Sequence, residues 1–597
     1  MVEPVSVAWV GRTGRVSLRV PTKHEDGGVA VSIVTEDGRT LSVPPPTDEV
    51  DHAEVEGVEY TAMSVSLPDL SPGYHRLTVR AGGAEHDGLL LSAPQRCFQG
   101  PAAPRWGAFL PLYAMRSERN WGIGDMTDLG ELIDWARGLG ADAVGTLPML
   151  AAFLDGTFEP SPYAPSSRLF WNELYVDVER APELARCREA RELIASPEFR
   201  RLIGRARSGH YVDHRLVYSL KRRALEPLAR VFWEREVAIG ALEGEYARFR
   251  AKVERTTNWR YHIYVQQLME AQLAETAGQA GLFLDMPLGV HPHGFDTWRF
   301  RDAFAHGVNG GSPPDSFFTR GQDWGFPPLH PERIREQEYR YPIACIRHLM
   351  RHASALRIDH VMWMRRMFWV PEGMPATRGV YVGYREEELY ALLALESHRN
   401  RTAVVGEDLG TVPGGVRRAM ARHGVHRMFV LQYELRPGRP YPLAPVPNAA
   451  QASLNTHDMP TFLAMWEGLD IEQRLGLGLI DEGEAEAARR DRERLRSALV
   501  ATLGNAGFLD REGHGKAVMR AAHRLLASSP ARMLMVNLED LWGERRPQNV
   551  PGTGPERPNW VRKAARSFEE FRESAEVVGT LEEIDRLRGA RKGKGTA

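Results

Sequence analysis

Acidic residues follow several apolar segments of this chain at matching positions. Asp285 comes after "GLFL", Asp359 after "ALRI", and Glu407 with Asp408 after "AVVG". Asp458 ends the segment "SLNTHD". If the apolar segments are the strands of a parallel barrel, their carboxyl ends lie at one mouth, where catalytic groups are found. The pattern therefore predicts a cluster of carboxylates at one mouth.

Three carboxylates at one mouth suit chemistry on glycosidic bonds. One carboxylate attacks the anomeric carbon, a carboxylic acid protonates the leaving oxygen, and a further anion stabilises the cationic transition state or holds sugar hydroxyls. Side chains alternate along a strand, so Arg357 and Asp359 point the same way, and the arginine favours the ionised form that a nucleophile needs. The like charge of Asp408 favours the protonated form of Glu407, as an acid needs. The spacing alone does not assign the three roles.

Other interpretations of the same residues stay open. Any one of these acids could simply cap a helix or pair with an arginine, whereas their occurrence together favours catalysis. "HPHGFD" places His291 and His293 two residues apart, but no distant group of His or Cys accompanies them, so no metal site is predicted. "GIGDMTDLG" lacks the spacing of a phosphate-binding loop and predicts a tight connection from a strand to a helix.

Eight apolar segments alternate with helical patterns from residue 105 onward. This alternation predicts an α/β fold, a (β/α)8 TIM barrel with large helical insertions, and an open doubly wound sheet is the alternative. The eight predicted strands lie at 105–113, 141–150, 281–290, 355–363, 402–410, 427–435, 451–459 and 531–541.

The spacing of these strands defines the expected domains. Short alternating runs such as "VSLRV" and "HRLTV" predict an N-terminal β-sandwich over residues 1–95, and a Pro-rich linker follows at 96–104. The catalytic barrel is expected over 105–565. Within it we expect a helical insertion at 151–280, because apolar residues recur every three or four positions in two of its segments, 177–209 and 214–254, and a covering loop region at 291–345. A C-terminal helix and a disordered basic tail, "RGARKGKGTA", are expected within 566–597.

Composition excludes several classes of function. The net charge is −2 and the chain has no basic stripe, so nucleic acid is not expected as a partner. No run of 18 apolar residues occurs, so no membrane association is expected. The N-terminus does not have the pattern of a signal peptide, and the three cysteines (Cys97, Cys187 and Cys345) are far apart, which predicts reduced thiols and a cytoplasmic location. The sequence does not predict the oligomeric state.

Several motifs resemble those of the 4-α-glucanotransferases, the amylomaltases or disproportionating enzymes of glycoside hydrolase family 77. "RIDH", "GEDLGTVP" and "THDMPT" occur in the order of that family's core motifs. "NWGIGDMTDL" is similar to its segment after the first strand, and "SPPDSFFTRGQDWGFPPL" resembles its mobile covering loop. "NVPGTGPERPNWVRK" resembles its C-terminal signature. The resemblance covers roughly residues 105–565, and it implies a barrel that acts on maltooligosaccharides and other α-1,4-glucans with no metal or organic cofactor.

The resemblance also implies roles for individual residues. Asp359 corresponds to the nucleophile and Glu407 to the acid/base, while Asp458 with His457 corresponds to the pair that holds the donor sugar. The remaining residues implied to contact the substrate or the nucleophile are Arg357, His360, Asp285, Trp324, Tyr163 and Asp408.

The chain departs from the family pattern at four positions. Gly145 and Thr146 replace a usual Trp-Gln pair, Met459 replaces a usual Asn, and Glu173 replaces a usual Pro. All of the catalytic acids are present, so activity is expected.

Three functions are compatible with these residues and motifs. The first is transfer of an α-1,4-glucan segment to the 4-hydroxyl of another sugar through a covalent glycosyl-aspartate, with retention. The second is hydrolysis of the same intermediate, which depends on how well the loop at 310–329 excludes water. The third is a non-catalytic glycan-binding protein, which a missing carboxylate would have supported.

Overall fold

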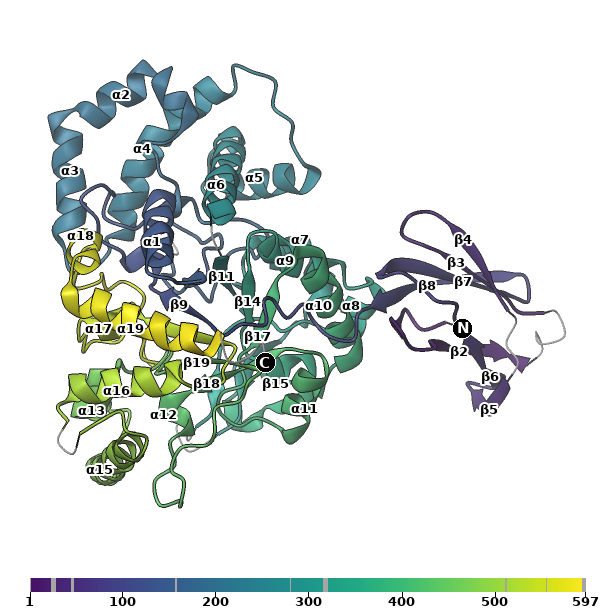
Figure 1. The fold of residues 1–597 in the computed structure, drawn as a ribbon. Coiled ribbons are helices and arrows are strands. Elements are labelled where there is room, and N and C mark those ends of the chain that lie inside the picture. Colours follow the sequence, from purple (N-terminus) through teal and green to yellow (C-terminus); the bar gives the residue numbers. More distant parts are fainter. Residues whose placement is uncertain are drawn as a thin grey trace. The chain divides into compact units, whose positions relative to one another are not determined.

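The computed structural model describes residues 2–22, 28–44, 48–155, 158–279, 281–314, 320–510, 513–554 and 556–592. Its contacts divide the chain into two compact units. Unit 1 contains residues 1–100, 297–351 and 360–425, and unit 2 contains residues 101–296, 352–359 and 426–597. Figure 1 labels their helices and strands.

The N-terminal strands of unit 1 form the predicted β-sandwich. One sheet has the order β1-β8-β7-β3-β4 and the other has the order β2-β6-β5. Alternate residues of these strands fill the space between the sheets, among them Leu18, Val20, Ile33, Val79 and Leu90, which are fully buried. The strands are β1 (Val5–Trp9), β2 (Arg15–Pro21), β3 (Ala30–Val34), β4 (Thr40–Val43), β5 (Asp48–Val55), β6 (Val58–Ser66), β7 (Gly73–Ala81) and β8 (Ala84–Ala93).

All eight strands predicted from residue 105 onward form one closed parallel barrel, so the open sheet is excluded. The order around the barrel is β10-β11-β14-β17-β18-β19-β20-β9. The strands are β9 (Arg105–Phe109), β10 (Ala143–Gly145), β11 (Gly281–Met286), β14 (Ala355–Ile358), β17 (Ala403–Gly406), β18 (His426–Val430), β19 (Ala450–Ser453) and β20 (Met533–Asn537). Each strand is shorter than the apolar segment that predicted it. As a result Asp359, Glu407 and Asp458 lie just beyond strand ends.

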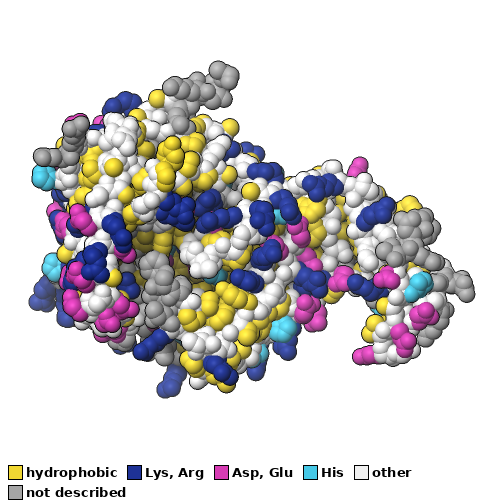
Figure 2. All heavy atoms as spheres, turned by 90° about the horizontal axis from the view of Figure 1, so that it is seen from below, with side chains coloured by type: hydrophobic (Ala, Val, Ile, Leu, Met, Phe, Trp, Pro, Cys, Tyr) yellow, Lys and Arg dark blue, Asp and Glu magenta, His cyan; other side chains and the backbone are white. Residues whose placement is uncertain are grey.

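Helices follow most of the barrel strands. They are α1 (Met126–Gly138), α7 (Phe295–Arg299), α8 (Pro331–Glu336), α9 (Arg340–Met350), α10 (Glu386–Asn400), α11 (Gly414–Arg422), α12 (Leu431–Glu434), α13 (Phe462–Glu467), α14 (Leu469–Gly476), α15 (Glu482–Asn505), α16 (Gly515–Ala527) and α17 (Leu538–Leu541). Among the described residues, no helix is both long and apolar enough to cross a membrane. Basic and acidic side chains are both spread over the face shown in Figure 2.

The insertion between β10 and β11 is helical only in its later part. Its helices are α2 (Arg188–Ala195), α3 (Pro197–Ser208), α4 (His214–Phe232), α5 (Ala241–Val253) and α6 (Trp259–Gln279). Before Arg188 the described chain forms loops and two 3₁₀ turns, so the α-helices of the predicted insertion begin only at residue 188. Prolines at 160, 162 and 165 remove the backbone donors that a helix needs there.

A small antiparallel sheet in unit 1 was not predicted. It has the order β13-β12-β15-β16, from β12 (Val308–Ser312), β13 (Gln322–Asp323), β15 (Arg366–Pro371) and β16 (Val380–Gly383). These strands are between 2 and 6 residues long, too short to show a clear alternation of side chains. β12 and β13 lie within the expected covering loop, of which residues 315–319 lie outside the described part of the chain.

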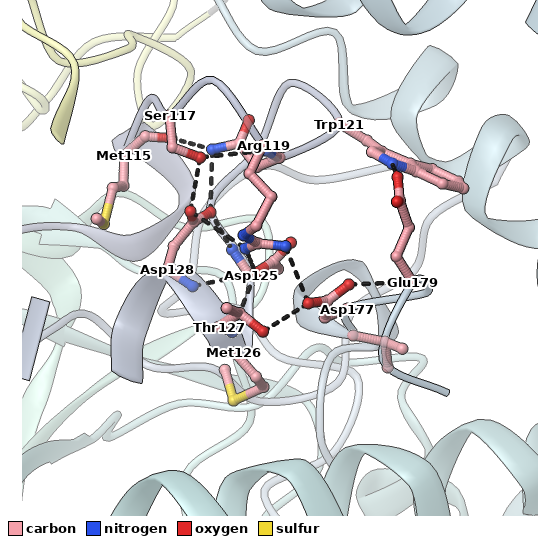
Figure 3. A network of polar contacts seen from close by, with 12 residues as sticks. Met115, Ser117, Arg119, Trp121, Asp125, Met126, Thr127, Asp128, Asp177 and Glu179 are labelled. Atoms are coloured by element: carbon pink, nitrogen blue, oxygen red, sulfur yellow. Dashed lines mark hydrogen bonds and ion pairs between the residues drawn. The ribbon is translucent and has the colours of Figure 1, made fainter. Parts of the chain in front are cut away.

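The connection from β9 to α1 runs from residue 110 to residue 125, so it is longer than the predicted tight connection, and a network of buried charges holds it (Figure 3). Asp125 accepts hydrogen bonds from the backbone of Thr127 and Asp128, and the Asp128 side chain accepts one from the Asp125 backbone. Arg119 pairs with Asp125, with Asp128 at 3.2 Å and with Asp177 at 2.9 Å. Burial and the neighbouring carboxylates of Asp128 and Asp177 raise the pKa of Asp125 to about 7. The network ties the loop after the first barrel strand to the start of the insertion.

The C-terminal segment is more ordered than predicted. It forms α18 (Phe568–Arg572) and α19 (Ala575–Lys592), so the expected tail does not begin at Arg588. Arg588 is fully buried and donates hydrogen bonds to the carbonyl of Arg105 at 2.8 and 3.0 Å and to that of Ser529 at 3.1 Å. Residues 593–597 of the predicted tail lie outside the described residues. A basic residue in a polar C-terminal sequence is indistinguishable from tail by composition, which is why the sequence did not reveal this contact.

Candidate functional site

Arg357 binds two carboxylates in unit 2. Parallel pairing of β11 and β14 places Asp285 opposite Arg357. One terminal nitrogen of Arg357 lies 2.7 and 2.8 Å from the two oxygens of Asp285, and the other lies 2.9 Å from Oδ1 of Asp359. The prediction that Arg357 and Asp359 point the same way is confirmed. Asp285 joins them because its strand is the next one in the barrel.

The balance of charge at Asp359 differs from the expectation. Burial raises the pKa of Asp359, and the charge of Arg357 lowers it, while the carboxylates of Asp285 and Asp458 raise it further. The net direction is upward, opposite to the lowering that the sequence predicted from Arg357 alone, and burial is the largest cause.

A chain of hydrogen bonds continues from Asp285 to Asp458. The hydroxyl of Tyr163 donates to Asp285 at 2.6 Å and lies 2.7 Å from Nε2 of His457. The same Nε2 lies 3.0 Å from Oδ2 of Asp458. Because the tyrosine proton goes to Asp285, the Nε2 proton is shared between the tyrosine oxygen and Asp458. The arrangement brings together four residues that the sequence predicted for the substrate site.

Asp458 is stabilised in its charged form. Burial alone would raise its pKa, but the charge of His457 and hydrogen bonds from His457 and Asn549 lower the pKa of Asp458 to about 2. The side-chain amide of Asn549 donates to Oδ1 of Asp458 at 2.8 Å. Asn549 lies in the segment "NVPGTGPERPNWVRK" but was not predicted as a site residue.

Aromatic rings enclose His457. Its ring stacks on Tyr163, with centroids 5.2 Å apart, and on Phe109 at 6.2 Å. Trp560 lies at a tilt to both Tyr163 and His457. Neither Phe109 nor Trp560 was predicted as a site residue. Their apolar contacts restrict the ring and so hold Nε2 toward Asp458 and Tyr163.

The departures from the family pattern have local explanations. A Cβ on Gly145 would lie 3.3 Å from Phe109 and 3.4 Å from Met535, so a small residue there leaves room for these side chains. Thr146 accepts a hydrogen bond from the Leu112 backbone at 2.8 Å, and it lines a cavity that also includes Asp285, Arg357 and His457.

The other two departures are Glu173 and Met459. Glu173 is buried and accepts a hydrogen bond from the hydroxyl of Tyr261 at 2.8 Å. The backbone of Met459 donates to the Thr456 carbonyl at 3.2 Å, and nothing in the structure explains the choice of methionine there.

Glu407 is held by the backbone in unit 1. Its Oε2 accepts a hydrogen bond from the His360 backbone at 2.9 Å, and its Oε1 accepts one from the Leu409 backbone at 2.6 Å. His360 has a left-handed conformation (φ 45°, ψ 60°), which costs about 1 kcal/mol or more for a residue with a Cβ. That strain turns the His360 N–H toward Glu407. Both oxygens of the carboxyl are therefore fixed relative to the main chain.

The neighbours of Glu407 in unit 1 have different surroundings. Asp408 is fully buried and pairs with Arg417 at 2.7 Å, so this burial does not favour the predicted contact with substrate. The His360 ring packs edge-on against Trp324 at 5.2 Å, and burial lowers the pKa of His360 to about 4. Trp324 is half-buried and stacks on Phe326. Its role as a platform for sugar rings stays a prediction.

The described residues contain no group of three or more His, Cys, Asp or Glu side chains that could hold a metal ion. His291 and His293, which were considered for such a site, lie with ring centroids 5.8 Å apart, and His291 also packs edge-on against Phe153. Burial lowers the pKa of His291.

Comparison with known proteins identifies the family. The family model described as 4-alpha-glucanotransferase matches residues 110–259 and 243–567, and the model of the MalQ N-terminal beta sandwich domain matches residues 1–94. A 4-alpha-glucanotransferase of Mycobacterium tuberculosis (strain H37Rv) is 35% identical over 90% of this chain and 81% of its own length. The Haemophilus influenzae protein of the same name is 30% identical over 88% of this chain and 86% of its own.

A solved structure agrees with these relatives. The amylomaltase from Corynebacterium glutamicum superposes with a TM-score of 0.87 at 27% identity, covering 98% of this chain and 90% of that one. The match includes both the sandwich and the barrel. This chain belongs to the 4-α-glucanotransferase family.

Proposed function

We propose that this protein transfers segments of α-1,4-glucans to the 4-hydroxyl of another glucan or of glucose, with retention of configuration. The observation that carries the proposal is that Arg357 of β14 binds both Asp285 of β11 and Asp359, which follows β14 in the motif that resembles the family's nucleophile. Relatives that bear the name 4-alpha-glucanotransferase support the same reaction. The substrates would be maltooligosaccharides and longer α-1,4-glucans.

In the first step, the Asp359 carboxylate attacks the anomeric carbon and the bond to the leaving oxygen breaks. Glu407 gives its proton to that oxygen, which departs as a free 4-hydroxyl. The product of this step is a glycosyl ester on Asp359. Arg357 stabilises the negative charge of the Asp359 carboxylate before the ester forms and again after the ester is cleaved.

In the second step, a 4-hydroxyl of the acceptor attacks the same carbon. Glu407 takes the hydroxyl proton, and the bond to Asp359 breaks to return the carboxylate. Two inversions give retention. For this mechanism the carboxyl groups of Asp359 and Glu407 should lie about 5–5.5 Å apart in the working enzyme, against about 6.5–9.5 Å for an inverting one.

The chain of Tyr163, His457 and Asp458 is suited to hold the donor sugar. Asp458 accepts hydrogen bonds in its charged form and has a lowered pKa, so it would stay an acceptor for sugar hydroxyls at neutral pH. Asp285, on the other side of Tyr163, would orient the tyrosine. Trp324 and His360 stay predicted contacts of the glucan, on the resemblance to the family.

The products formed from maltotriose test the proposal. Transfer predicts glucose together with a ladder of maltooligosaccharides longer than the substrate. Hydrolysis by the same intermediate predicts glucose and maltose alone. A protein that only binds glycans predicts unchanged maltotriose, and either of these last two outcomes would overturn transfer as the function.

A further inference from the structure

The segment between the sandwich and the barrel binds the end of α11. We define residues 95–99 as the linker clamp. The Gln95 carbonyl accepts a hydrogen bond from Nδ1 of His423 at 3.1 Å, and the Cys97 backbone donates to the His423 carbonyl at 2.8 Å. The side chain of Gln99 donates to the Gly424 carbonyl at 2.7 Å. A linker that merely spans two domains does not need a bond at every second residue.

The linker clamp also binds the end of α10. The Phe98 backbone donates to Oγ of Ser397 at 2.8 Å, and that hydroxyl donates to the carbonyl of Thr402 at 2.6 Å. Nε2 of His398 donates to the Arg96 carbonyl at 2.9 Å. Ser397 and Thr402 are fully buried. Thr402 immediately precedes β17, so the linker clamp is two hydrogen bonds away from the start of that strand.

The sandwich itself supports the same helix. The Tyr74 hydroxyl, from β7, donates to Oε1 of Glu396 at 2.7 Å, and Arg347 of α9 binds both oxygens of that carboxylate at 2.7 and 3.0 Å. Glu396 is buried next to Ser397. Trp9, from β1, stacks on the ring of His423. All of these contacts lie within unit 1.

The two helices held in this way flank the strand that leads to Glu407. α10 ends at Asn400 and α11 begins at Gly414, and between them lie β17 and the proposed acid/base. β17 has four residues, and a strand advances about 3.3 Å per residue. Both oxygens of Glu407 are bonded to main-chain N–H groups of its own unit, so the carboxyl cannot correct for a displaced backbone by rotating. Its position therefore depends on where β17 begins.

We propose that the linker clamp and Tyr74 position Glu407, by fixing the start of β17 through Ser397 and Glu396. Ser397 and Tyr74 are thus positioning residues for proton transfer, although neither touches substrate. This inference rests on the proposed role of Glu407. It assigns to the N-terminal sandwich a part in catalysis rather than in carbohydrate binding.

The test is a comparison of two donors on the full chain. Maltotriose needs a proton from Glu407 on its leaving oxygen, whereas a maltosyl fluoride needs little protonation, because fluoride is a good leaving group. For Ser397→Ala we expect turnover of maltotriose to fall about 10- to 100-fold, the scale of a misplaced catalytic group. The first-turnover release of fluoride should stay within about twofold of the wild type. If Ser397 had only a structural role, turnover of maltotriose and release of fluoride would fall together in this variant.

Matched controls separate position from stability. Ser92→Ala removes a buried hydroxyl that donates a hydrogen bond to the Leu70 carbonyl within the sandwich, and this variant should keep the wild-type activity on both donors. Tyr74→Phe repeats the test with a different contact and serves if Ser397→Ala does not fold. Its control is Tyr264→Phe, which removes a hydroxyl bonded to Glu183 in the helical insertion.

Two results would overturn the inference. One is an equal loss on both donors in Ser397→Ala and Tyr74→Phe, and the other is no loss beyond that of the controls. Glu407→Gln measured in parallel keeps this separate from the proposed function. If that variant loses both donors equally, the acid/base assignment itself is wrong, whatever the clamp variants do.

Discussion

At the scale of residues, Asp359 is the carboxylate on which the proposed chemistry depends. Asp359 competes with Asp285 for Arg357, so its replacement removes the nucleophile without leaving the arginine unpaired. Asp359→Asn should therefore fold normally and lose activity by several orders of magnitude, on the order of losses seen for deleted nucleophiles. Turnover of maltotriose and the thermal unfolding midpoint measure the two effects. Retention of more than a few per cent of turnover would mean that another residue is the nucleophile.

Glu407→Gln separates proton transfer from nucleophilic attack. Glutamine cannot donate the proton that maltotriose needs, so turnover of this donor should fall by about 10²- to 10⁴-fold. A maltosyl fluoride should still glycosylate Asp359, and the ester should turn over slowly because the base that activates an acceptor is gone. Mass spectrometry of the intact protein should show the added maltosyl group. Equal losses on both donors with no adduct would transfer the role to another carboxylate.

The residues of the site differ in how far the sequence could predict them. Asp285, Asp359 and Glu407 follow apolar segments, and that local pattern was enough to predict their place. Asn549 contacts Asp458 across 91 positions of sequence, and no local signal marks such a contact. The direction of the pKa shift of Asp359 was misjudged because its largest cause is burial, which the neighbouring Arg357 does not reveal.

At the scale of elements, Gly122 shows how the loop after β9 meets the helical insertion. Its φ is +97°, and a Cβ there would lie 2.7 Å from the carbonyl of Ala206 in α3. Gly122→Ala should lower the free energy of unfolding by about 2 kcal/mol, because it adds both strain and a clash. Gly204 lies on an exposed part of the same helix with no atom near its Cβ position. Gly204→Ala should raise the free energy by about 1 kcal/mol, since alanine favours helix. Chemical denaturation measures both, and equal effects would contradict the contact.

The eight barrel strands were predictable because each is an apolar run between helical patterns. The small sheet of β12, β13, β15 and β16 was not, because its strands are short and because β12 pairs with the distant strand β15. The α-helices of the insertion begin only at Arg188, because prolines before that residue decide the backbone and the apolar residues there pack without forming an α-helix. Local sequence patterns were thus sufficient to predict the barrel strands, whereas they did not predict the strands of the small sheet.

At the scale of the whole molecule, buried histidines set the response to acid. Burial lowers the pKa of His523 to about 4, against about 6.5 in an unfolded chain. Between these values the unfolded state binds the extra proton, so stability is full above about pH 6.5 and is lost as the pH falls toward 4. From pH 7 to pH 5 His523 should account for a loss of about 2 kcal/mol. In His523→Gln the decline of the unfolding free energy over this range should be smaller by that amount, and an unchanged slope would contradict it.

Arg588 joins the last described helix to the first barrel strand. Arg588→Ala would leave the carbonyls of Arg105 and Ser529 without their buried donor, and it should lower the free energy of unfolding by about 3 kcal/mol. Arg588→Lys keeps the charge but loses the fork of donors, so it should recover only part of that loss. Thermal unfolding midpoints should rank wild type above Lys and Lys above Ala. A chain that ends at Lys592 should match the wild type, because it retains Arg588.

The bond between Arg588 and Arg105 also has a consequence for biosynthesis. The two residues are 483 positions apart. At roughly 5–20 residues per second, a ribosome needs about half a minute to a minute and a half to reach Arg588 after making Arg105. For most of that time β9 lacks β20, the partner that closes the barrel. The N-terminal sandwich, whose strands all lie before Ala93, can thus be complete while most of the barrel has yet to be translated.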